Sequence, residues 1–468
     1  MEKLSNIYEK NVALIDSTLR VGESFDMLRK KLKVADGELT MYYIDGFVKD
    51  TVMQKLMMHF LSLKSIGTAE DFQIENLPYV ETEVCYDTDL MIQMVMSGAT
   101  LMLGSSFGAA AIIIDSREYP ARVTAEPDND RVMRGARDGF VETLIFNTAL
   151  IRRRVRDPRL TVYHTTVGSV SRTDVVLCYM DHKADPKYVE YLKEKLKKIK
   201  AKSLTMGHQS LAECLAGSGW FNPFPKIRCT ERPDAAVSQL LEGCVILICD
   251  NSPEAMILPT SVFDFMQETG DFYFPPLTGT YLRLVRQIVF WSTLVITPLW
   301  YLCLMNASAL PEALKFLVPT ESAALPILVQ ILVVEFLLDG LKLASMNTPD
   351  MLSNSLSVVG GLLLGDLAVG LGWLLPEVIL CIAFVAIGSF TQTSYELGYA
   401  FKFMRILILI LTACLNVWGF ALGLVVSLVL IASNKTVNRR RSYLYPVIPF
   451  NGRALLGLLI RPKKNSDS

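Results

Sequence analysis

Between residues 288 and 434 the chain has almost no charge, and this feature constrains its fold more than any other. The whole chain has 46 Lys and Arg residues and 47 Asp and Glu residues, yet only 12 of these charged residues fall in that stretch, which is nearly a third of the sequence. A helix needs about 20 apolar residues to cross ~30 Å of hydrocarbon. We therefore expect a membrane domain joined to a large water-facing domain, which excludes a purely soluble enzyme and a disordered chain.

The rest of the chain resembles a soluble protein but lacks the patterns of several function classes. The formal net charge is −1, so no bulk positive charge attracts a nucleic acid, and we expect no nucleic-acid partner. The nine cysteines contain no CxxC pair, and the histidines His59, His164, His182 and His208 form no HExxH motif. The sequence therefore predicts no metal site and no cofactor. The polar N-terminus has no apolar h-region, so we expect no cleavable signal peptide.

Two segments outside the apolar stretch repeat one order of elements. A helix over 89–97, Gly98 and strands over 99–104 and 109–115 are expected in the first. A helix over 233–242, Gly243 and strands over 244–250 and 255–258 are expected in the second. A hairpin over 160–168 and 173–180 lies between them. The predicted fold class is an α+β cytosolic domain of two related lobes, followed by an all-α polytopic membrane domain.

The pattern also suggests domain boundaries. We expect a polar helical segment over 1–35, lobes over 36–165 and 166–282, a membrane domain over 283–434 with four to six spans, and a basic cytosolic tail over 435–468.

The number of membrane crossings follows from charge at the two ends of the apolar stretch. Five apolar runs are visible: 288–305, 323–344, 355–375, 376–390 and 406–432. Basic residues precede the first run and follow the last, so the positive-inside rule places both flanks in the cytoplasm and requires an even number of crossings. Either one run is re-entrant, or the last run bends at Asn416 and Gly419 into a pair of short helices.

Acidic residues inside the apolar runs are the strongest candidates for function. A charged side chain in hydrocarbon costs free energy, so such residues usually have a functional role. Glu335, Asp339 and Lys342 are spaced to share one helix face. Two interpretations remain open: an Asp339–Lys342 ion pair with a structural role, or a polar stripe along a path for cations. Asp366 and Glu377 add acids in neighbouring runs, and an excess of acid favours cations. These five residues form the predicted ion pathway.

Gly361 and Gly365 form a GxxxG motif, which allows helices to pack closely within one subunit or between subunits. One subunit with four to six short crossings encloses little volume, so we expect a homo-oligomer around a shared pore. Neither a nucleophile elbow nor a GxGxxG motif has the context that its chemistry requires, and we expect that the protein is not an enzyme.

Five short motifs identify a family more specifically than composition, charge and spacing do. They are EPD at 126–128, RGARDGF at 134–140, NTALIRRR at 147–154, NPFP at 222–225 and TERPD at 230–234. With them, the chain resembles the GerA family, the A subunits of bacterial spore germinant receptors, over almost its whole length. Three further motifs resemble a branch of this family other than the nutrient-receptor A subunits: PEVIL at 376–380, SYEL at 394–397 and YPVIPFN at 445–451. ASMNTP at 344–349 differs from the nutrient-receptor pattern.

The resemblance implies a multi-pass protein of the spore inner membrane, with its large N-terminal domain in the spore core. It implies a subunit of an oligomeric ion channel, a pentamer by analogy, that releases monovalent cations and amplifies germination. Its implied partners are other spore membrane germination proteins and membrane lipid. The alternatives are a nutrient-sensing A subunit that works with B and C subunits, or a non-conducting scaffold for germination proteins.

Overall fold

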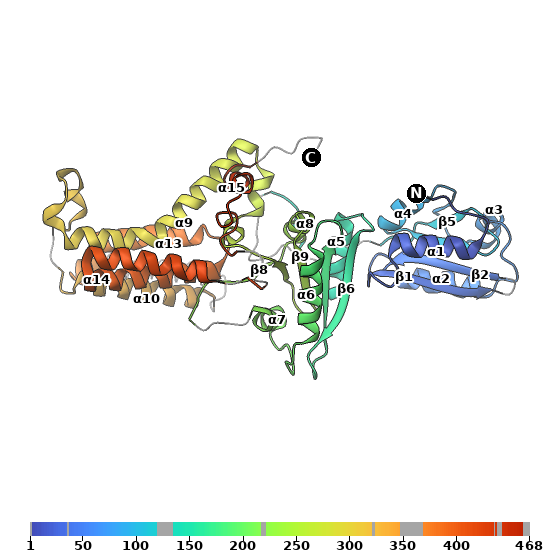
Figure 1. Cartoon of the computed structure of the whole chain (residues 1–468), viewed down its shortest axis with the longest axis horizontal. Coiled ribbons are helices and arrows are strands. Elements are labelled where there is room, and N and C mark those ends of the chain that lie inside the picture. Colours follow the sequence, from blue (N-terminus) through green and yellow to red (C-terminus); the bar gives the residue numbers. More distant parts are fainter. Residues whose placement is uncertain are drawn as a thin grey trace. The chain divides into compact units, whose positions relative to one another are not determined.

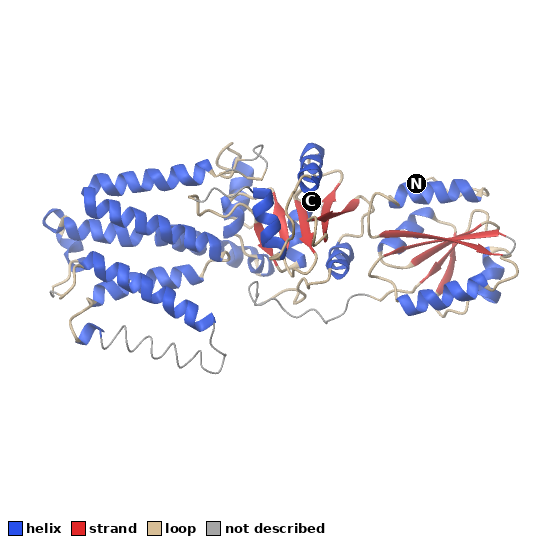
Figure 2. Ribbon diagram, turned by 90° about the horizontal axis from the view of Figure 1, so that it is seen from below, coloured by secondary structure: helices blue, strands red, loops and turns tan. Residues whose placement is uncertain are grey.

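The chain forms two compact units in a computed structural model that describes residues 2–34, 37–118, 134–216, 221–320, 323–346, 368–434, 436–437 and 442–461. The sheet unit contains Met1–Ser218 and Ile227–Thr260, and the helical unit contains Gly219–Lys226 and Ser261–Ser468. Both sheets lie in the sheet unit, and the described part of the helical unit is helices and turns (Figures 1 and 2). The predicted fold class, two α+β lobes followed by a helical region, is confirmed in these terms.

The first lobe is a five-stranded antiparallel sheet with helices on both faces (Figure 2). Its strands, in the spatial order β1-β2-β4-β5-β3, are β1 (Met27–Val34), β2 (Gly37–Ile44), β4 (Thr100–Gly104), β5 (Ala111–Ile114) and β3 (Thr82–Cys85). Helices α1 (Tyr8–Leu19) and α4 (Thr88–Met96) cover one face, whereas α2 (Asp50–Leu61), α3 (Ala69–Asp71) and the π-helical turn η1 (Phe72–Asn76) cover the other.

This lobe has two cores, because successive side chains of the central strands point to opposite faces of the sheet. Leu101 and Leu103 pack with α1 and α4, whereas Met102 between them packs with α2. Successive side chains of a strand point to opposite faces, so a strand that is apolar at every position is buried on both sides. The expected helical segment 1–35 contains α1, but it also contains β1 at the edge of the sheet.

The second lobe repeats the topology of the first. Its strands, in the order β6-β7-β9-β10-β8, are β6 (Leu160–Val167), β7 (Thr173–Met180), β9 (Val245–Cys249), β10 (Ala255–Leu258) and β8 (Arg228–Thr230). Its helices are α5 (Leu144–Arg154), α6 (Pro186–Lys197), α7 (Gly207–Ala216) and α8 (Pro233–Leu241). In each lobe a hairpin comes first, the third strand lies at an edge, and a helix then leads into the last two strands.

Gly98 and Gly243 mark equivalent points of the repeat. Each follows the helix that precedes the last two strands, and their φ angles are +103° and +97°. Glycine adopts this conformation without the steric cost that a Cβ brings. The prediction of two related lobes is confirmed.

A buried ion pair joins the two lobes. Arg152 on α5 donates from Nε to Asp26 Oδ2 at 2.7 Å and from Nη2 to Asp26 Oδ1 at 2.9 Å. Both side chains are almost completely buried. The N–H of Phe25 also donates to the carbonyl of Val162 in β6 at 2.7 Å. The segment that leads into β1 is therefore held against the second lobe.

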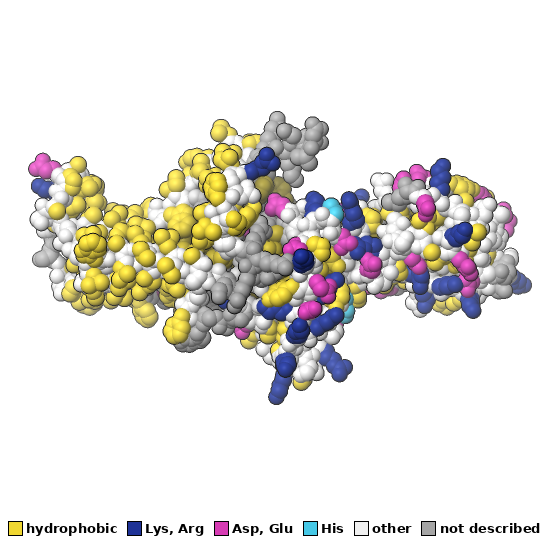
Figure 3. Space-filling view, in the orientation of Figure 1, with side chains coloured by type: hydrophobic (Ala, Val, Ile, Leu, Met, Phe, Trp, Pro, Cys, Tyr) yellow, Lys and Arg dark blue, Asp and Glu magenta, His cyan; other side chains and the backbone are white. Residues whose placement is uncertain are grey.

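The helical unit is built on α9 (Pro276–Met305), α10 (Ile327–Met346), α13 (Pro376–Phe390) and α14 (Tyr395–Ser433). Its shorter elements are η2 (Val262–Met266), η3 (Thr269–Tyr273), η4 (Ala307–Ala309), η5 (Glu312–Leu317), α12 (Ala368–Gly370) and α15 (Gly452–Leu459). Helices α9 and α14 have the length and composition needed to cross a membrane. Hydrophobic side chains gather over α9, α13 and α14 on the face that Figure 3 shows.

Helix α14 is a hairpin of two helical segments, 395–415 and 417–433. Asn416 has φ 55° and ψ −131° and breaks the helix. A Cβ at Gly423 would lie 2.9 Å from the Cα of Ile408, although a straight helix would separate these residues by about 22 Å. Of the two alternatives left open by the sequence, the bend at Asn416 is therefore present, and the last apolar run is a pair of helices.

A pair of side-chain amides connects the tip of this hairpin to the end of α9. Asn306, the C-cap of α9, donates from Nδ2 to Asn416 Oδ1 at 2.6 Å, and Asn416 Nδ2 donates back to Asn306 Oδ1 at 3.1 Å. Phe290 and Phe401 are in ring contact nearer the other ends of these helices. The first segment of α14 thus runs along α9 in the same direction.

Candidate functional site: a charge network between α10 and α14

Two acids of α10 meet two bases of the first segment of α14. Glu335 and Asp339 lie one helical turn apart, and so do Lys402 and Arg405, so each helix presents a matched pair to the other. We call these four residues the charge network. Their formal charges cancel, which is the condition under which ionised groups are tolerated in an apolar interior.

Arg405 and Glu335 form the buried half of the charge network. Arg405 donates from Nη2 and Nε to Glu335 Oε1 at 2.7 and 3.0 Å, and from Nη1 to the carbonyl of Thr293 in α9 at 3.0 Å. Both charged side chains are 7% exposed. The guanidinium group therefore bridges three helices.

Lys402 and Asp339 form the more accessible half. The Lys402 ammonium donates to Asp339 Oδ2 at 2.5 Å and to the Glu335 carbonyl at 3.0 Å, and lies 3.2 Å from Glu335 Oε2. The ammonium therefore makes two hydrogen bonds, and the Glu335 carboxylate adds an ion-pair contact. The Asp339 side chain is 29% exposed, whereas that of Lys402 is 12% exposed.

The other predicted pathway residues lie apart from the charge network or outside the described residues. Lys342 donates to Ser389 Oγ at 3.3 Å, and its ammonium lies 5.1 Å from the ring centroid of Phe390. The ion partner found for Asp339 is therefore Lys402 instead of Lys342. Glu377 lies in the first turn of α13, and its buried Oε2 has no hydrogen-bond partner among the described residues. Asp366, Gly361 and Gly365 lie outside the described residues.

Sequence reasoning found both acids of the charge network but missed both bases. Lys402 and Arg405 are three residues apart in a helix of otherwise apolar character, which is the spacing of one helix face. A base inside an apolar run needs an acid close by, so these two residues were recognisable as the partners that Glu335 and Asp339 require.

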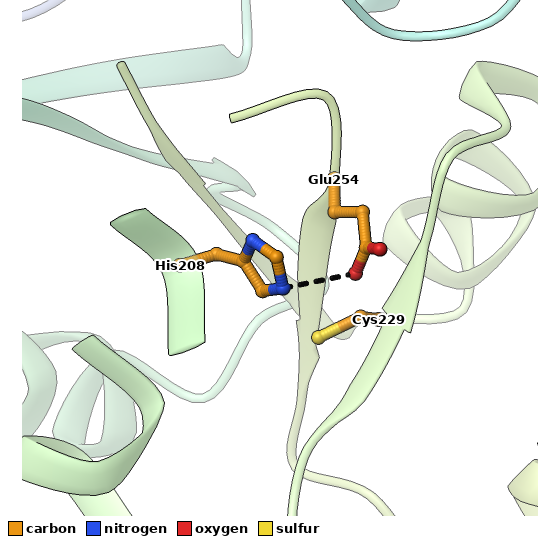
Figure 4. Close-up of side chains that lie close together, drawn as sticks. All are labelled: His208, Cys229 and Glu254. Atoms are coloured by element: carbon orange, nitrogen blue, oxygen red, sulfur yellow. Dashed lines mark ion pairs between the residues drawn. The ribbon is translucent and has the colours of Figure 1, made fainter. Parts of the chain in front are cut away.

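A second side-chain cluster lies in the second lobe of the sheet unit. His208 on α7, Cys229 on β8 and Glu254 just before β10 have ligand atoms within 4.8 Å of one another, and all three residues are half-buried (Figure 4). His208 Nε2 lies 3.1 Å from Glu254 Oε2. These are residue types that bind transition metals. No sequence motif points to the cluster, because its members come from three separate elements.

The chain resembles spore germination proteins over most of its length. Residues 15–467 match the family described as Bacillus/Clostridium GerA spore germination protein. The chain is 36% identical to stage V sporulation protein AF of Bacillus subtilis (strain 168), covering 97% of this chain and 92% of that protein. It is 27% identical to spore germination protein KA of the same organism, covering 97% and 84%.

A solved structure also resembles part of the chain. The N-terminal domain of the A subunit of the Bacillus megaterium spore germinant receptor GerK3 matches with a TM-score of 0.41 and 22% identity, over 55% of this chain and 96% of that one. The assignment to a family rests on the sequence matches, which extend through both units and confirm the expected resemblance. The chain belongs to the Bacillus/Clostridium GerA family of spore germination proteins.

Proposed function

We propose that the chain is a subunit of an oligomeric membrane ion channel that acts in spore germination, releases monovalent cations and amplifies the germination response. The observation that supports this most is the charge network, which lies between helices whose outward faces are apolar. Ionised groups inside a membrane domain are costly, so they are found where they serve a path for ions or protons. The names of the related proteins refer to sporulation and spore germination, and we propose the same biological process for this chain.

The two halves of the charge network have different roles in this proposal. Arg405 and Glu335 are buried and hold α9, α10 and α14 together. Asp339 is partly exposed, so its carboxylate can face water and meet a cation. When a cation approaches Asp339, Lys402 retains Glu335 as a second carboxylate partner at 3.2 Å. The path therefore gains a negative site without leaving an unpaired ammonium group.

The proposal includes an arrangement in the cell. We place the protein in the spore inner membrane as a multi-pass subunit with the sheet unit in the spore core. The even number of crossings is supported by the α14 hairpin, which turns one apolar run into two helices. Gly361, Gly365, Asp366 and Glu377 complete the proposed subunit contact and ion path. The proposed partners are further copies of the chain, five in the simplest ring, other spore germination membrane proteins and lipid.

Reconstitution of the full chain tests both parts of the proposal. Mass measurement of the detergent-solubilised protein should give a multiple of the 52.2 kDa chain mass. The same preparation in potassium-loaded liposomes should release K⁺ faster than protein-free liposomes, with or without added germination proteins. A strict monomer that conducts would contradict the oligomer, and a stable oligomer that releases no K⁺ under either condition would contradict the channel.

A further inference from the structure

The cluster of His208, Cys229 and Glu254 is built by the pairing of strands at one edge of the second sheet. Cys229 of β8 pairs with Met256 of β10. Glu254 lies two residues before Met256, so it falls on the same face of the sheet as Cys229 and is its diagonal neighbour. The thiol and the carboxylate are therefore placed side by side by register, independently of any bound ion.

Helix α7 brings His208 to this pair. Gly207 begins the helix with φ +49°, and a Cβ at this position would lie 3.3 Å from the Cβ of Ser252. The glycine thus lets the start of α7 approach the turn that precedes β10. His208 is the next residue, and its ring points between Glu254 and Cys229 (Figure 4).

A buried hydroxyl orients the imidazole ring. His208 Nδ1 lies 2.5 Å from Ser252 Oγ, and Ser252 is 2% exposed. In a metal-bound state Nδ1–H would donate to this oxygen, which leaves the lone pair of Nε2 for the ion. A metal-binding histidine has this arrangement, because its second nitrogen donates to a neighbouring acceptor that fixes the tautomer and the ring orientation.

We infer that His208 Nε2, Cys229 Sγ and a Glu254 carboxylate oxygen form a binding site for a divalent transition metal ion of the Zn²⁺ class, with water as the fourth ligand. Zn²⁺ takes thiolate, imidazole and carboxylate ligands at about 2.0–2.3 Å in tetrahedral geometry, which places neighbouring ligand atoms about 3.3–3.6 Å apart. The His208–Glu254 separation of 3.1 Å is close to this value. The thiol needs only a small side-chain movement, since all ligand atoms already lie within 4.8 Å.

The site differs from an ordinary surface pair of histidine and carboxylate. His164 and Asp174, on adjacent strands of the same sheet, lie 2.9 Å apart, but they are not part of a cluster of three such ligands among the described residues. The three ligands of the proposed site come from α7, β8 and the turn before β10, so a bound ion would connect α7 to an edge strand. The proposal is independent of the ion path in the helical unit.

Cobalt binding by the full chain tests the site. Protein purified in detergent without a histidine tag is stripped with chelator and titrated with Co²⁺. The expected result is one Co²⁺ per chain with a thiolate-to-cobalt charge-transfer absorption that Zn²⁺ abolishes. Cys229→Ser should remove this absorption, His208→Gln and Glu254→Gln should weaken binding at least tenfold, and Ser252→Ala should weaken it about 10–100-fold.

Matched variants separate this site from other thiols and histidines. Cys214→Ser removes an exposed cysteine of the same lobe, and His164→Gln removes the comparable histidine; neither should change the affinity or the absorption. Circular dichroism and thermal unfolding identify any variant that fails to fold, and Cys229→Ala serves as a second thiol variant. An absent charge-transfer absorption in the folded wild type, or an unchanged one in folded Cys229→Ser, would overturn the proposal.

Discussion

Arg405 and Glu335 form a buried ion pair in which two guanidinium nitrogens, at 2.7 and 3.0 Å, donate to one carboxylate oxygen. The partners lie 70 positions apart in sequence, on α14 and α10. Glu335, an acid inside an apolar run, therefore has a matched base on another helix. The pair connects α10 to α14 in the helical unit. Its contribution to the free energy of unfolding can be measured separately from ion conduction.

Breaking this pair should destabilise the helical unit. Arg405→Gln leaves Glu335 buried with only Lys402 as an ion partner, and loss of one member of a buried pair costs about 3–5 kcal/mol. We expect a lower unfolding temperature in detergent and less protein in the membrane. The double variant Glu335→Gln with Arg405→Gln should lose less stability than the sum of the two single changes. Additive losses would show that the two residues are not coupled.

A methyl group at Gly419 should disrupt the α14 hairpin. A Cβ there would lie 1.8 Å from the Leu411 carbonyl oxygen, so the two helical segments must separate. Gly419→Ala should cost about 1–3 kcal/mol, the range for overpacking. Gly340→Ala is the matched control, because its Cβ would meet no described atom within 4 Å, and alanine favours the helix by up to about 1 kcal/mol. Thermal unfolding of both variants compares them, and equal stabilities would contradict the hairpin.

The lobes of the sheet unit should loosen when their buried ion pair is removed. Asp26→Asn leaves the buried Arg152 guanidinium without its carboxylate, at a cost of about 3–5 kcal/mol. Hydrogen exchange of the Phe25 amide, which donates to Val162, should become faster. Arg159→Gln breaks the more exposed Asp157–Arg159 pair and should leave the stability almost unchanged. Unchanged exchange in Asp26→Asn would show that the pair does not hold the lobes together.

Acid should weaken the Asp115–Arg117 ion pair, which lies just after β5. The side-chain hydrogen bond from Arg117, followed by its charge, lowers the pKa of Asp115. A lowered folded-state pKa contributes stability above the unfolded value of about 3.9 and loses it as the pH falls through the folded value. The stability difference between wild type and Asp115→Asn should therefore shrink below about pH 4. Urea unfolding at pH 7, 4 and 3 measures it, and a pH-independent difference would contradict this origin.

The sequence predicted the lobes well because their signals are local. Gly98 and Gly243 end a helix and lead into apolar strands in both halves. Strand β1 was missed because its sequence is rich in Lys and Arg, which suits an edge strand and hides the alternation of apolar residues. Register with β2, where Leu32 faces Leu39, reveals its place in the sheet.

The contacts of the candidate site were harder to predict because they connect distant segments. The spacing of residues along α10 places Glu335 near Asp339, but it does not show which residues of α14 lie against them. An Asp339–Lys342 ion pair on one helix was one of the two interpretations left open, whereas the ammonium group that pairs with Asp339 belongs to Lys402. The cluster of His208, Cys229 and Glu254 depends on strand register and on the path of α7, which no single motif encodes.

We propose that Asp339 contributes a negative site to a cation path, and K⁺ efflux from liposomes containing equal amounts of folded protein measures this contribution. Asp339→Asn preserves the side-chain size and leaves Lys402 paired with Glu335. Glu312→Gln, at a 94% exposed acid in η5, is the control for loss of one negative charge. We expect several-fold slower efflux for Asp339→Asn and wild-type efflux for Glu312→Gln. Equal efflux from wild type and Asp339→Asn, at equal protein and assembly, would contradict this proposal.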